Sequence, residues 1–194
     1  MQKIEIDAVI AAARKSPEFM HSALRVGLAF GELRNAVIRD FADEIIVALN
    51  DGVRVVDVRA WRERPTASYA GFTVRHPGWP SGLEVAVEAQ SGGVNDYILG
   101  VVARNRAKRD NKPPFFSEEF RNAVSKAATT RLGGGSSTAG WAWYQYVDKE
   151  WRNFSTATAL DALVEKNQLI NYLVTKITMM EEAIAEVLAV GVAM

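Results

Sequence analysis

Carboxylates and an amide share one face of a predicted strand in the middle of the chain. Glu84, Glu88 and Gln90 alternate with apolar residues over 83–90, so a strand here places them on its polar side. Asp57 lies in an earlier predicted strand. Metal-dependent nucleases use acids on neighbouring strands and a third polar residue to hold Mg²⁺ and to orient the attacking water. These four residues are therefore the candidate catalytic set of a nuclease hypothesis, in which Mg²⁺ is the cofactor.

The same polar face also has a simpler interpretation. The solvent-facing side of an antiparallel sheet should carry such residues, and Arg59 and Arg75 on neighbouring predicted strands offer opposite charges. Two usual parts of the nuclease pattern are missing, namely a Pro-Asp dipeptide before the acidic strand and a lysine at the third position. We therefore favour a protein without catalytic residues, metal ion or cofactor, and keep the Mg²⁺-dependent nuclease as the alternative.

A second alternative rests on the basic run at 104–109, which contains Arg104, Arg106, Lys108 and Arg109. Such a run can grip phosphates, and the neighbouring phenylalanines 115 and 116 offer faces on which bases stack. However, Lys plus Arg and Asp plus Glu both number 23, so the chain has no net charge to draw it to nucleic acid. We expect nucleic-acid binding only as an alternative.

Five aromatic residues are the candidates for a partner-binding surface: Trp79, Trp141, Trp143, Tyr144 and Tyr146. The last four alternate across both faces of a predicted strand, so some of them must be core. Aromatic side chains concentrate at binding hot spots, so we expect the exposed ones to contact a protein partner of unknown identity.

The rest of the composition limits the kinds of catalytic and metal site that the chain can form. There is no cysteine, which excludes disulfides, thiol nucleophiles and Cys-ligated zinc, and His21 and His76 are too few for a convincing metal site. The first residues do not resemble a signal peptide, and no run approaches the roughly 18 apolar residues of a membrane span. We expect a cytoplasmic protein that does not enter a membrane.

These residues must be positioned by a sheet and helices. Predicted strands at 53–61, 69–75, 83–90, 97–103 and 141–147 follow one another through short connections, which favours a five-stranded, mainly antiparallel sheet. A Ser-Gly-Gly turn joins the two central strands. A shorter helix over 117–131 interrupts the series, since Ser117 can cap it and two acids follow. The fold class is therefore α+β.

A long amphipathic helix is predicted at each end of the chain, over 17–49 and 156–190. The first is preceded by a short helical piece at 4–13, and it contains Gly27 and Gly31, for which we favour close packing of a neighbour over a kink. We expect one domain, 1–194, in which a helical layer (1–50) and the C-terminal helix pack together across the sheet region (53–148). Surplus apolar length should project and pair with a second protomer, which predicts a homodimer.

The order of Trp79, the strands at 83–88 and 97–101, the aromatic strand 141–147 and a closing helix resembles the C-terminal part of PD-(D/E)XK nuclease superfamily proteins of bacteria and phages. The similarity covers 53–188. In such proteins the nuclease core precedes this region, whereas here only helices precede it, so no catalytic residue is carried over. The resemblance implies a non-catalytic recognition or assembly part, encoded by a phage or mobile element and acting on a host defence or nucleic-acid-processing complex.

Overall fold

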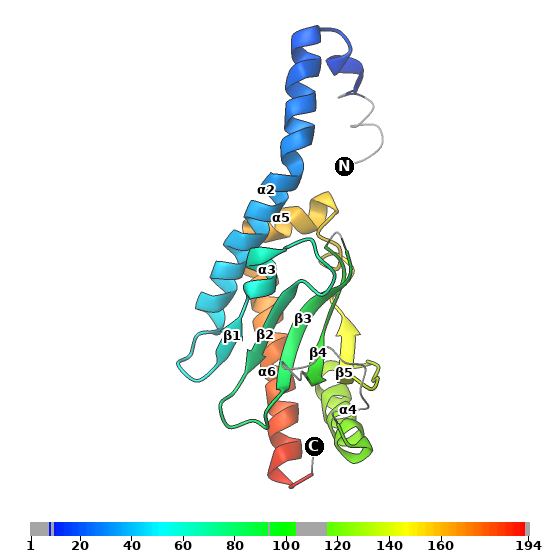
Figure 1. The fold of residues 1–194 in the computed structure, drawn as a ribbon. Helices are drawn as coiled ribbons and strands as arrows, with labels where there is room; N and C mark the ends of the chain where they lie inside the picture. The colour runs from blue at the N-terminus through cyan, green and yellow to red at the C-terminus, as the bar shows by residue number, and fades with distance from the viewer. Residues whose placement is uncertain (1–7, 9, 93, 104–115, 193–194) are drawn as a thin grey trace.

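The computed structural model describes residue 8 and residues 10–92, 94–103 and 116–192. Its centre is one antiparallel sheet with the strand order β1-β2-β3-β4-β5, so each strand pairs with its neighbour in sequence (Figure 1). The strands are β1 (Val55–Asp57), β2 (Gly71–Arg75), β3 (Leu83–Ser91), β4 (Asn95–Ala103) and β5 (Trp141–Tyr146). The helices are α2 (Pro17–Leu49), α3 (Arg59–Glu63), α4 (Glu118–Leu132), α5 (Ala157–Glu165) and α6 (Asn167–Ala189). The predicted α+β class with a five-stranded antiparallel sheet is confirmed.

The helices cover one face of the sheet. In Figure 1, α6 runs behind the strands, the C-terminal half of α2 lies along the β1 side, and α4 lies near β5. The buried residues of the core come from the sheet and from both long helices, including Phe72, Val85, Val87, Leu99 and Val101 from the strands, Ile38, Phe41, Ile45 and Leu49 from α2, and Leu173, Ile177, Met180 and Ile184 from α6. This apolar burial is the main force that fixes the sheet against the helices.

Only part of the predicted strand 53–61 is a strand. The chain leaves the sheet after Asp57, whose carboxylate accepts a hydrogen bond of 3.1 Å from the backbone N–H of Arg59, and α3 begins there. This turn carries Trp61 into the core, where it is fully buried against Phe41 and Phe72. Burying the indole therefore takes precedence over the β-branched pattern that predicted a longer strand.

Helix α2 has the predicted bounds. The side chain of Ser16 accepts a hydrogen bond from the backbone N–H of Phe19, proline occupies the first turn, and the chain turns away at Asn50 and at Gly52, where φ is +80°. Its N-terminal half projects beyond the sheet (Figure 1). The expected close packing at Gly27 and Gly31 is not found within one chain, because nothing lies within 4 Å of where a Cβ would stand at either residue.

The helix predicted over 156–190 is divided in two. Lys166 adopts a positive φ of 57° between α5 and α6, and its Nζ lies 2.8 Å from Oε1 of Glu44 on α2. The two helices point in different directions (Figure 1), so α5 lies against α2 while α6 lies against the sheet. Apolar spacing alone did not reveal the division because both pieces keep apolar residues at three- and four-residue intervals.

Candidate functional site

The residues of the nuclease hypothesis lie on one face of the sheet but two strands apart. Asp57 pairs with Thr73 of β2, and Thr73 pairs with Ala86 of β3. Glu88 pairs with Gly71 on one side and with Ile98 on the other, so it is not in the cross-strand row of Asp57. Since neighbouring strands are about 4.8 Å apart, the backbones of the two acids are separated by roughly 10 Å across the sheet.

Asp57 is engaged by the arginine that follows it. Nη2 of Arg59 lies 2.5 Å from Oδ2 of Asp57, and Nε lies 3.0 Å from Oδ1. The pKa of Arg59 is raised, chiefly by this side-chain hydrogen bond. Arg59 lies in α3 and not on a strand, so this ion pair with Asp57 is a local contact and differs from the predicted pairing across neighbouring strands.

The expectation that the polar face of β3 is solvent-exposed is wrong. Glu84 is 2% exposed and Glu88 is 5% exposed, and the amide of Gln90 lies 3.4 Å from a Glu88 carboxylate oxygen. Alternation predicts which side chains share a face, but it does not predict whether that face is covered. Within the part of the chain that the structure describes, no three or more His, Asp or Glu side chains are grouped so that they could hold a metal ion. Arg104, Arg106, Lys108 and Arg109 lie outside the described residues.

The structure separates the five aromatic candidates. Trp143 is fully buried in the core, so its assignment to a partner-binding surface is wrong. Trp141 and Tyr144 are half-buried with ring centroids 6.0 Å apart, and the exposed Tyr146 lies under the guanidinium of Arg152 at 4.4 Å. These three residues share the edge strand β5. Trp79 is half-buried in the connection between β2 and β3, where it packs on His76.

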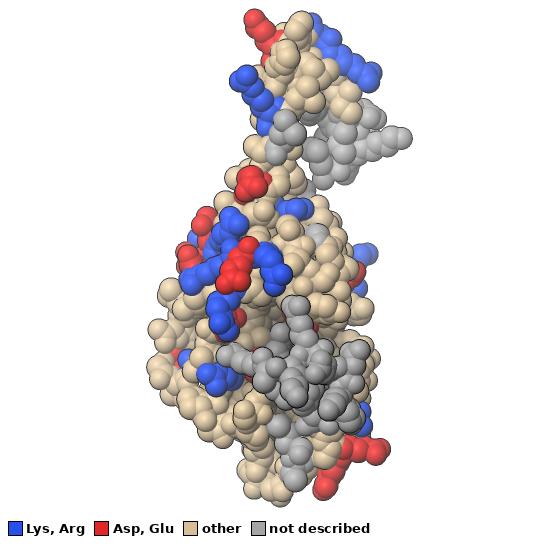
Figure 2. All heavy atoms as spheres, viewed as in Figure 1, with Lys and Arg blue, Asp and Glu red and all other residues tan. Residues whose placement is uncertain are grey.

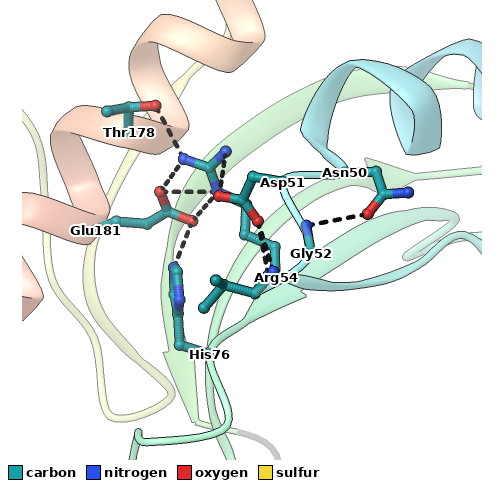
Figure 3. A network of polar contacts seen from close by, with 8 residues as sticks. Asn50, Asp51, Gly52, Arg54, His76, Thr178 and Glu181 are labelled. Carbon is teal, nitrogen blue, oxygen red and sulfur yellow. Dashed lines mark hydrogen bonds and ion pairs between the residues drawn. The ribbon is translucent and has the colours of Figure 1, made fainter.

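A polar network joins α6 to the sheet (Figure 3). The carboxylate of Glu181 accepts hydrogen bonds from Nε of Arg54 at 2.9 Å and from Nη2 of Arg54 at 2.7 Å. It also lies 3.1 Å from Nε2 of His76. Side-chain hydrogen bonding to Glu181 raises the pKa of Arg54. His76, Trp79 and Glu181 also line an open groove of about 650 Å³. Sequence reasoning missed this network because Arg54 and Glu181 are 127 residues apart and neither stands in a motif.

A second groove, of about 570 Å³, lies between α2 and α5. Its lining is mainly apolar and consists of Phe30, Leu33, Arg34 and Val37 from α2, Leu160, Asp161 and Val164 from α5, and Ser155 and Thr156 before α5. Leu33 and Val164 remain exposed at its rim. The groove could accept an apolar side chain or one face of a helix.

Exposed apolar residues continue from the groove along the projecting half of α2. Phe19 is 60% exposed, Val26 is 70% exposed and Phe30 is 48% exposed. Figure 2 shows charged side chains at the tip and on the sides of this projecting part with uncharged surface between them, and a cluster of acids and bases on the body just below it. Large apolar side chains that gather on an exposed surface are typical of interaction sites, which makes the projecting half of α2 a candidate for one.

Comparisons with protein-family models, with curated proteins and with solved structures gave no match. The resemblance to PD-(D/E)XK nuclease superfamily proteins therefore stays a prediction. No helix in the described ranges has the length and apolar character that crossing a membrane requires.

Proposed function

We propose that this protein is an assembly module without catalytic activity of its own, which self-associates through the projecting half of α2. One observation supports the proposal above the others: an apolar side of this helix is exposed and runs into the groove between α2 and α5. A helix docked there would cover the exposed phenylalanines and fill the groove at once.

The energetics favour a covered helix. A helical segment of about 15 residues is marginal in water when it packs on nothing, so the projecting part needs contacts to stay ordered. Each large apolar side chain that becomes fully buried contributes roughly 1.5–3 kcal/mol. Phe19, Val26, Phe30 and Leu33 are 48–70% exposed, so burying these side chains on both copies contributes a free energy of the same order as the cost of association.

Light scattering over a range of concentrations tests self-association. We expect the mass to approach twice the 21.3 kDa of one chain as concentration rises. Val26→Glu should shift the protein towards the monomer, because it places a charge on the apolar side of the helix. Leu24→Glu is the matched control, since Leu24 is similarly exposed, at 57%, but lies off the line of Phe19, Val26 and Phe30.

Two results would contradict the proposal. The first is a mass of one chain at every concentration, and the second is an equal loss of dimer in Val26→Glu and Leu24→Glu. The absence of catalysis is tested separately by incubating plasmid DNA with the protein and Mg²⁺ or Mn²⁺. Cleavage that disappears in Glu88→Ala would overturn the non-catalytic assignment in favour of the nuclease.

A further inference from the structure

We infer that the second copy docks in the antiparallel direction, with the two α2 helices crossing at residue 28. This inference rests on the proposed self-association and specifies its geometry. The projecting tip of each α2 then lies in the groove between α2 and α5 of the other copy.

The apolar side of α2 has the spacing of a coiled-coil seam. Its residues follow one another at intervals of 4, 3, 4, 3 and 4: Phe19, Ala23, Val26, Phe30, Leu33 and Val37. A repeat of 3.5 residues keeps apolar side chains on one line along a helix that winds around a partner. The last three residues of this seam also line the groove, so seam and groove form one surface.

The side-chain sizes along the seam complement those of a second copy when the two α2 helices are antiparallel. A two-fold axis at residue 28 sets Phe19 opposite Val37, Ala23 opposite Leu33 and Val26 opposite Phe30. Every layer then combines a larger side chain with a smaller one, which is how packed layers fill space evenly. A parallel pair would instead set Phe30 against Phe30 and Ala23 against Ala23, which crowds one layer and leaves a void in the other.

The flanks of the seam carry little charge. Ser22, Ala29 and Ala36 lie on one flank and Met20 and Gly27 on the other, so no row of like charges opposes the approach of a second helix. Glu18, Arg25, Glu32 and Arg39 recur every seven residues further round α2, away from the partner, and Arg39 donates to the backbone carbonyl of Arg62 in its own chain. The direction is therefore set by the side-chain sizes along the seam.

The structure leaves room for this crossing. The antiparallel register brings Phe19 of the second copy to the level of Val37, beside Leu160 and Val164 of the groove. Gly27 and Ala29 flank the seam next to the axis, and nothing lies within 4 Å of where a Cβ on Gly27 would stand. Two helices can therefore approach closely at the crossing point.

Cross-linking measures the direction directly, because the full chain has no cysteine. Ser22, Ala29 and Ala36 are exposed on one flank of the seam, so each can be changed to cysteine and treated with a short bifunctional maleimide. In the antiparallel pair the two copies of residue 29 are about 3 Å apart along the axis, and the two copies of residue 36 are about 24 Å apart. Residue 22 of one copy is close to residue 36 of the other.

We expect Ala29→Cys to give cross-linked dimer by itself. Ser22→Cys and Ala36→Cys should each give only background, whereas a mixture of these two variants should give the cross-linked heterodimer. Efficient cross-linking of Ala36→Cys alone would overturn the antiparallel geometry while leaving the proposed self-association intact. A mass of one chain at every concentration would overturn both, and capture of a different protein's helix by the same surface would then identify the occupant.

Discussion

The guanidinium of Arg54 holds the buried carboxylate of Glu181 with two nitrogens, Nη2 at 2.7 Å from Oε2 and Nε at 2.9 Å from Oε1. Nη2 also donates to the hydroxyl of Thr178 at 3.3 Å, and His76 approaches the carboxylate from the β2 side at 3.1 Å. The network thus fastens the middle of α6 to the chain just before β1. Because the carboxylate is largely shielded from water, these bonds are stronger than surface pairs and their loss is costly.

Arg54→Met tests this connection. The substitution keeps the apolar stem but removes the charge and the donors, leaving Glu181 buried beside His76 and Thr178. We expect the free energy of unfolding in urea to fall by about 2–3 kcal/mol. Glu182→Gln is the control, since this neighbouring acid is exposed and reaches Arg131 only at 3.8 Å, and it should change stability by less than about 0.5 kcal/mol. A loss below about 0.5 kcal/mol in Arg54→Met, no larger than that of the control, would show that the network adds no more stability than a surface ion pair.

Trp61 and Tyr97 form a second buried contact, in which the indole Nε1 donates to the tyrosine hydroxyl at 2.9 Å. Burial raises the pKa of Tyr97 well above its ordinary value of 10.0, and the hydrogen bond from Trp61 lowers it only in part. Desolvation raises the pKa of Tyr172 in the same direction. A tyrosine that holds its proton more tightly in the folded state contributes stability that is complete below the unfolded pKa and is lost as pH rises above it.

We therefore expect the free energy of unfolding to decrease above about pH 10, with a slope of up to about 1.4 kcal/mol per pH unit for each of these tyrosines. Tyr97→Phe should show a shallower alkaline decrease. It should also be less stable at neutral pH, because the Trp61 N–H loses its acceptor. Denaturant titrations from pH 7 to 12 measure both effects, with Tyr146→Phe at the exposed edge as the comparison. An alkaline slope unchanged in Tyr97→Phe would contradict the assignment.

Local signals in the sequence were sufficient for several elements. Ser16 and Pro17 marked the beginning of α2, and the Asn-Asp-Gly turn after Leu49 marked its end, since capping and turn residues act on their immediate neighbours. The alternation over 83–90 and the following Ser-Gly-Gly predicted the β3–β4 hairpin, although not its register, which the structure shows to pair Val87 with Leu99. The projection of α2 also followed from sequence, because the helix is longer than the core it covers.

The features that sequence could not predict depend on distant partners. The positive φ of Lys166 comes with a contact to Glu44, which is 122 residues away, and the apolar spacing continues through the break. Arg54 and Glu181 meet only once α6 lies against the sheet. Glu84 and Glu88 stand at positions that alternation assigns to solvent, yet both are buried. In each case tertiary contacts override a local pattern.

Tertiary contacts also distinguish the aromatic residues of β5, which the sequence pattern treats alike. Substitution of Trp143 and Trp141 can measure the difference in their contributions to stability. Trp143→Ala should lower the free energy of unfolding by about 3–5 kcal/mol, because the indole is fully buried in the core. Trp141→Ala, at a half-buried position two residues earlier, should cost clearly less. Thermal unfolding compares the two. If Trp143→Ala were well tolerated and instead impaired binding of another protein, the partner-binding role would have to be restored to this residue.

Gly27 and Gly31 offer the sharpest comparison on α2, because nothing lies within 4 Å of where a Cβ would stand at either residue. Glycine in a helix interior is about 1 kcal/mol less favourable than alanine. Gly31→Ala should therefore stabilise the projecting helix without weakening the dimer. Gly27→Ala should stabilise the helix as well, but its methyl group would stand beside the proposed crossing point and force the two helices apart.

We expect sedimentation equilibrium to give a dissociation constant for Gly27→Ala about tenfold above that of Gly31→Ala, equivalent to about 1.4 kcal/mol, because overpacking a close contact costs about 1–3 kcal/mol. Circular dichroism at a concentration where both variants are monomeric serves as the control. Under this condition the helix content should increase equally in Gly27→Ala and Gly31→Ala. Identical dissociation constants would mean that Gly27 faces solvent in the dimer and that the helices cross elsewhere on α2.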